Sequence, residues 1–107
     1  MKLRVFLSTI IAGTISVLSA HAAPKLNVVT TTSMLTDLVR TVGGDRIEVQ
    51  GLMGPGVDPH LYKATSKDVA NLQRAQLVIY HGLMLEGQMS ELLGRVAKGG
   101  RRVVAVL

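Results

Sequence analysis

The sequence predicts an α/β fold: a mostly parallel four-stranded sheet with flanking helices. Four short apolar runs, rich in valine and isoleucine, alternate along the chain with three segments of helical periodicity. This alternation is typical of strands joined by crossover helices. With 107 residues the chain has room for one domain at most, and with no cysteine it has no disulfide framework or thiolate metal site.

The first residues predict a secretory signal rather than part of that domain. Lys2 and Arg4 precede an uncharged apolar stretch, residues 5–20, and Ala20-His21-Ala22 supplies small residues around a cleavage point. A membrane span needs about 20 apolar residues, and this stretch is shorter and interrupted by polar residues. We therefore expect residues 1–22 to be a signal peptide and residues 23–107 to be the folded part.

Composition excludes several classes of function. Only three aromatic residues are present, so bases of single-stranded nucleic acid have almost nothing to stack on, and no basic stripe favours DNA. Because no cysteine follows the signal to take a lipid, we expect a periplasmic protein without a membrane anchor.

The first half of the folded part should contain a strand, a helix and a second strand. Leu26–Thr30 is a β-branched run, and the hydroxyl side chains that follow it suit the start of a helix. That helix should run to Val42 and end at Gly43-Gly44. Its apolar face would comprise Met34, Leu35, Leu38, Val39 and Val42. The segment 47–52 alternates at first between apolar and polar residues, as a partly exposed strand does.

The second half should contain two helices and two strands. Thr65 can cap a helix while Asp68, three residues on, reaches back to it. Leu77–Tyr80 reads as a buried strand, and 88–98 as a helix that Gly99-Gly100 stops. The last run, 102–107, reads as a central strand with no following helix to cover it. We therefore expect the chain to be a piece of something longer.

The strongest candidate for chemistry is the loop 54–62. Its two glycines and two prolines fix the path of the backbone, and Pro59 limits how Asp58 and His60 can swing. A neutral imidazole on a stiff loop beside a carboxylate suits a metal ligand, with the carboxylate orienting the ring. From spacing alone, a loop histidine beside prolines is more often an ordinary turn residue.

A second histidine, His81, directly follows the third predicted strand. Ligands in α/β sheets gather beyond the carboxyl ends of the strands, so a site shared by His60 and His81 is conceivable. An imidazole placed directly after a buried strand more often makes a hydrogen bond to the protein than ligates a metal. No nucleophile elbow, phosphate loop or acid/base pair is present, since Glu86 and Glu91 lie five residues apart.

Taken together, these segments resemble the start of a zinc/manganese-type solute-binding protein of an ABC importer. The resemblance covers residues 26–107 and rests on an ordered set of motifs. These are Val28-Val29-Thr30-Thr31-Thr32-Ser33-Met34-Leu35 with Asp37, Val42-Gly43-Gly44-Asp45, Gly54-Pro55-Gly56-Val57-Asp58-Pro59-His60-Leu61-Tyr62, Thr65 with Asp68, Ala75-Gln76-Leu77-Val78-Ile79-Tyr80, Gly82-Leu83 and Leu85-Glu86.

The resemblance implies a two-lobed protein that holds its metal between the lobes and delivers it to a membrane permease. The first lobe of such proteins supplies two histidines, and the first of these matches His60. The second histidine, the linking helix and the second lobe would lie beyond Leu107. The implied cargo is Zn²⁺ or Mn²⁺, the implied partner is an ABC permease, and we expect a monomer without enzymatic activity. The competing interpretations are a small secreted zinc hydrolase using His60, His81 and Asp58, and a non-functional remnant or structural domain.

Overall fold

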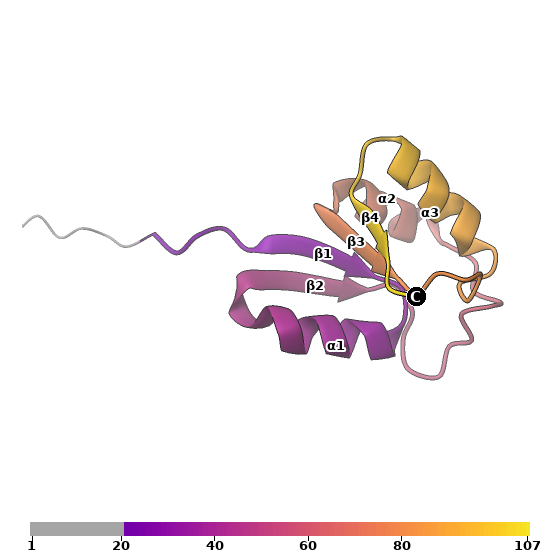
Figure 1. Cartoon of the computed structure of the whole chain (residues 1–107), viewed down its shortest axis with the longest axis horizontal. Coiled ribbons are helices and arrows are strands. Elements are labelled where there is room, and N and C mark those ends of the chain that lie inside the picture. The colour runs from indigo at the N-terminus through magenta and orange to yellow at the C-terminus, as the bar shows by residue number, and fades with distance from the viewer. Residues whose placement is uncertain (1–20) are drawn as a thin grey trace, which may run out of the picture.

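The computed structural model describes residues 21–107, so the expected signal peptide lies outside the described residues except for its last two positions. Four strands form one parallel sheet in the order β2-β1-β3-β4: β1 Leu26–Thr30, β2 Ile47–Gly51, β3 Leu77–Tyr80 and β4 Val103–Ala105. Helix α1 (Ser33–Gly43) lies on one face of this sheet, and α2 (Ser66–Arg74) and α3 (Met89–Lys98) lie on the other (Figure 1). The predicted fold class is confirmed.

The core lies between the sheet and the pair α2 and α3. There β1 and β3 bury Val29 and Val78 against apolar side chains of the two helices. The eight buried members of this cluster are Val29, Met53, Leu72, Ala75, Val78, Met89, Leu93 and Val96. Each Å² of apolar surface that this cluster removes from water stabilises the fold by about 25 cal/mol.

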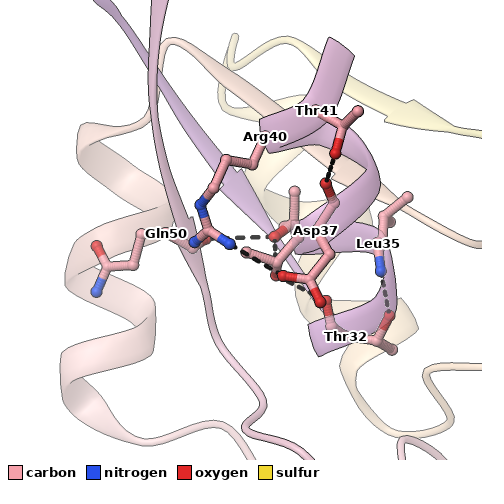
Figure 2. A network of polar contacts seen from close by, with 8 residues as sticks. Thr32, Leu35, Asp37, Arg40, Thr41 and Gln50 are labelled. Carbon is pink, nitrogen blue, oxygen red and sulfur yellow. Dashed lines mark hydrogen bonds and ion pairs between the residues drawn. The ribbon is translucent and has the colours of Figure 1, made fainter. Parts of the chain in front are cut away.

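Helix α1 begins where the sequence predicts. The hydroxyl of Thr32 accepts a hydrogen bond from the Leu35 backbone N–H at 3.2 Å (Figure 2), which satisfies one of the free donors at the helix start. Further along, the Thr41 hydroxyl donates to the Asp37 carbonyl, and Arg40 pairs with the Asp37 carboxylate at 2.9 Å (Figure 2). The helix ends at Gly43, and the next residue, Gly44, caps it with a φ of +54°, a positive value that glycine adopts without a steric penalty.

The apolar face expected for α1 is only partly buried. Leu35 packs fully, but Leu38 is 59% exposed and Val42 81% exposed. With Val39, these side chains line an apolar groove of about 290 Å³ that extends across the sheet to Ile79. Met34, also predicted on this face, is 72% exposed. The prediction failed at Met34, Leu38 and Val42 because periodicity shows which side chains share a face but not how far the sheet extends beneath them.

The remaining elements follow the predicted boundaries closely. Thr65 and Asp68 form a reciprocal capping box at the start of α2, in which each side chain accepts a hydrogen bond from the other's backbone N–H. A short 3₁₀ turn, Gly44–Arg46, which the sequence did not predict, joins α1 to β2. The last strand differs from expectation: β4 is three residues long, pairs with β3 and lies at the edge of the sheet. The run 102–107 is therefore not a central strand among the described residues.

Within residues 21–107, the structure has no helix of the length and apolarity that a membrane crossing demands.

Candidate metal site

The candidate site lies at the carboxyl edge of the sheet. Because all four strands are parallel, the segments that follow β1, β2 and β3 emerge at this same edge. Backbone hydrogen bonds continue beyond the strands here, from Leu52 to Thr30 and from Met53 to Thr31, both at 2.9 Å. The loop that carries His60 therefore starts from a fixed point beside the end of β1.

His60 and Asp58 form a compact turn in that loop. Oδ1 of Asp58 accepts hydrogen bonds from both the backbone N–H and the ring Nδ1 of His60, each at 2.9 Å. Since an ionised carboxylate only accepts, Nδ1 is the donor, and in the neutral ring Nε2 then carries the lone pair. The hydrogen bond from the His60 side chain also lowers the pKa of Asp58 below its ordinary value. This pairing gives His60 the tautomer and the ring orientation that a metal ligand at Nε2 needs.

The far end of the loop is held by Tyr62. Its hydroxyl donates to Oδ2 of Asp68 at 2.7 Å, and the same oxygen accepts from the Thr65 backbone N–H at 2.8 Å. The hydrogen bond to the buried Asp68 carboxylate raises the pKa of Tyr62 to about 12. The capping box that starts α2 thus also fixes the position of the chain two residues after His60. The sequence predicted the capping box but not the part of Tyr62 in it.

His60 lines an open hollow of about 650 Å³ at this edge. The other lining residues belong to the segment between β3 and α3 or to α3 itself: Met84, Gly87, Gln88 and Glu91. The His60 side chain is 61% exposed, so Nε2 is accessible to a ligand from solvent.

His81 is placed differently. Its Nε2 lies 2.8 Å from the Thr32 hydroxyl, within hydrogen-bond distance, and it is not among the residues that line the hollow of His60. The shared histidine site that is conceivable from the strand positions is therefore not formed in this arrangement. A hydrolase centre built from His60, His81 and Asp58 gains no support from it either.

The carboxylate of Glu86 is buried, which the sequence analysis did not predict. Glu86 is fully buried, and its carboxylate accepts hydrogen bonds from two backbone N–H groups and from the Thr31 hydroxyl. Thr31 lies 55 residues earlier in the chain. The sequence signals were the Leu85-Glu86 motif of the resemblance and its place between a buried strand and a helix, and neither predicted the contact with Thr31.

Across residues 21–107, no three side chains of His, Cys, Asp or Glu come together in a way that could hold a metal ion. In this part of the chain the arrangement offers one oriented imidazole at the rim of an open hollow. Its chemical capacity is to donate one nitrogen ligand to a cation.

Known proteins with similar sequences are metal-binding proteins by name. The chain is 48% identical over 87 residues to the zinc-binding protein TroA of Treponema pallidum, a match covering 81% of this chain and 28% of TroA. It is 46% identical over 77 residues to the manganese-binding lipoprotein MntA of Bacillus subtilis, covering 72% of this chain and 25% of MntA. The chain therefore spans between a quarter and a third of these two relatives.

Solved structures that are similar to this chain are also of metal-binding proteins by name. The periplasmic zinc-binding protein TroA of Treponema pallidum superposes with a TM-score of 0.73 at 48% identity, covering 78% of this chain and 30% of that one. The Zn(II)-bound AdcA of Streptococcus pneumoniae gives a TM-score of 0.68 at 32% identity, covering 77% of this chain and 18% of that one. The relatives are named for metal binding and not for catalysis.

The expected location is contradicted by these comparisons. MntA of Bacillus subtilis and the manganese ABC transporter substrate-binding proteins PsaA and ScaA of Streptococcus are named lipoproteins, and lipoproteins are held at a membrane by a lipid chain. The prediction of a protein free in the periplasm, without an anchor, is therefore wrong. The prediction was drawn from the absence of cysteine in this sequence, whereas these relatives are lipoproteins by name.

A family model also matches most of this chain. The model described as "Zinc-uptake complex component A periplasmic" covers residues 28–107, which include every strand and helix from the middle of β1 onward. The Asp58–His60 turn, the capping box and the buried Glu86 all lie within the matched range. This chain belongs to the ZnuA family of metal-binding solute-binding proteins.

Proposed function

We propose that this chain captures Zn²⁺ or Mn²⁺ through Nε2 of His60, for delivery to an ABC-type import permease. The observation that carries the proposal is the pair of 2.9 Å hydrogen bonds between His60 and Oδ1 of Asp58. They place the proton on Nδ1 and leave the Nε2 lone pair for a cation. The metal is cargo, so no bond-making step is required of the protein.

One imidazole does not enclose a metal ion. Zn²⁺ takes four ligands in closed sites, and the described residues supply no cluster of three or more candidate groups. The chain spans 28% of TroA. We propose that residues 23–107 form the N-terminal lobe of a two-lobed protein, and that the remaining ligands come from the part of that protein this chain does not match.

The choice of metal depends on those remaining ligands. Imidazole nitrogen suits Zn²⁺ well, whereas Mn²⁺ favours sites rich in oxygen. His60 is compatible with either ion, which agrees with relatives named for zinc and for manganese.

Titration of the chain with Zn²⁺, followed by NMR of the histidine rings, tests the proposal. We expect Zn²⁺ to shift the ring signals of His60 before those of His81, because Nε2 of His81 is engaged with Thr32. We expect His60→Ala to weaken Zn²⁺ binding at least about tenfold and His81→Ala, the matched loss of an imidazole, less than about threefold. Equal affinity of the His60→Ala variant and the unaltered chain would exclude His60 as the ligand.

A further inference from the structure

The carboxylate of Glu86 is an unusual group to find fully buried. Its burial is tolerated because both oxygens accept hydrogen bonds. Oε1 accepts from the His81 backbone N–H at 2.6 Å and from the Thr31 hydroxyl at 2.8 Å, and Oε2 accepts from the Gly82 backbone N–H at 3.2 Å. Burial of a carboxylate is unfavourable unless its hydrogen bonds are formed. Glu86 does not line the hollow that His60 lines, so direct contact with a metal there does not account for it.

The hydrogen bonds of Glu86 close a loop of strained backbone. Between the two N–H groups that it binds and Glu86 itself lie Leu83 and Met84, with φ of +48° and +62°. Residues other than glycine rarely adopt this left-handed conformation, because it is unfavourable for a residue that carries a side chain. Both side chains are largely exposed, 83% and 68%, so little apolar burial offsets that cost. The hydrogen bonds of the buried Glu86 carboxylate therefore stabilise the segment 81–87 in this conformation.

The residue after Glu86 connects this loop to His60. Gly87 lies so close to the main chain of His60 that an added Cβ would collide with the His60 carbonyl oxygen and stand 3.1 Å from its Cα. Its φ is +51°, again left-handed. At this separation a shift of the Gly87 backbone toward His60 would collide with the His60 main chain.

We propose that Glu86 is the positioning residue of His60. Its buried carboxylate fixes the strained 81–87 segment, and Gly87 transmits that fixed position to the His60 main chain by direct contact. Asp58 then sets the ring orientation from the other side through its hydrogen bond to Nδ1. The inference rests on the proposed role of His60 as a metal ligand, and it adds a residue outside the hollow on which that role depends.

Two variants disturb this arrangement by different routes. Glu86→Gln keeps the size of the side chain but turns one acceptor into an NH₂ group, which would point a donor at the N–H of Gly82. Gly87→Ala keeps the Glu86 carboxylate as an acceptor and introduces a Cβ that collides with the His60 carbonyl oxygen. The control is Glu48→Gln, the same chemical change at an exposed position on β2.

The readouts are the backbone and ring NMR signals of His60 in the metal-free chain and the affinity for Zn²⁺ alone. We expect both variants to shift the His60 signals and to weaken Zn²⁺ binding by about 10- to 100-fold, as loss of an outer group that orients a ligand typically does. Glu48→Gln should leave both readouts within about twofold, because an exposed side chain on β2 touches neither segment.

A lower melting temperature by itself would not support the inference, because any loss of buried hydrogen bonds produces it. A folded Glu86→Gln variant with unchanged His60 signals and unchanged Zn²⁺ affinity would overturn it. If that variant does not fold, unchanged His60 signals in Gly87→Ala would overturn it equally. If the unaltered chain shows no His60-dependent Zn²⁺ binding, the proposed function fails, and the metal-free His60 signals of the variants still decide whether Glu86 positions that residue.

Discussion

Replacing Asp68 by alanine should lower the free energy of unfolding by about 2–3 kcal/mol, although Asp68 is neither in the core cluster nor in the hollow of His60. Its Oδ2 accepts from the Thr65 backbone N–H at 2.8 Å and from the Tyr62 hydroxyl at 2.7 Å. The helix-start contribution, including the favourable charge near the positive end of α2, is about 1 kcal/mol. A hydrogen bond to a charged group adds about 1.5–3 kcal/mol when buried, and we take the lower end because Tyr62 is only partly buried.

Urea unfolding followed by circular dichroism measures this loss. The matched control is Asp37→Ala, which removes an aspartate from an exposed pair with Arg40 on α1 and should cost less than about 0.5 kcal/mol. Combining Asp68→Ala with Tyr62→Phe should show a coupling of about 1 kcal/mol, since both changes remove the same hydrogen bond. A loss below about 0.5 kcal/mol for Asp68→Ala, or no coupling with Tyr62, would refute this account of how the His60 loop is anchored.

Two further predictions concern stability. In the folded chain the pKa of Tyr62 is raised to about 12 from its ordinary value of 10.0, so Tyr62 stabilises the fold fully below about pH 10 and loses this effect as pH rises toward 12. Urea unfolding across this range should show a fall in the free energy of unfolding that is smaller in Tyr62→Phe. An identical fall in that variant would contradict the assignment. Leu72→Ala, at a fully buried position between α2 and the sheet, should cost about 2–5 kcal/mol. Leu38→Ala, beside the open groove, should cost less than about 1 kcal/mol, and similar losses for the two leucine variants in thermal unfolding would show that the core is misassigned.

Patterns among neighbouring residues predicted most of the helices and strands and pointed to the loop that carries Asp58 and His60. The α2 capping box involves residues three apart, and the hydrogen bonds between Asp58 and His60 involve residues two apart. Interactions at such short range are contained in the sequence pattern itself. For this reason the starts of α1 and α2 are predictable from neighbouring residues alone. The ligand role of His60 was instead predicted from the family resemblance, because the local pattern by itself favours an ordinary turn residue.

Long-range partners were not predictable in this way. Glu86 meets Thr31 across 55 residues and His81 meets Thr32 across 49, because the sheet order places β3 directly beside β1. Nothing in the periodicity of either segment encodes that order. The same order leaves β4 at the edge, where the sequence predicted a central strand.

The sequence by itself determined the alternation of strands and helices, the places where helices begin and stop, and the turn that orients the His60 ring, since each depends on residues within about one helical turn of one another. Only the tertiary structure decided that His81 lies within hydrogen-bond distance of Thr32 and that Glu86 is buried and bonded to Thr31. The same holds for the close approach of Gly87 to the main chain of His60. Those contacts exist because parallel pairing brings three separate segments to one edge of the sheet, where distance along the chain no longer measures distance in space.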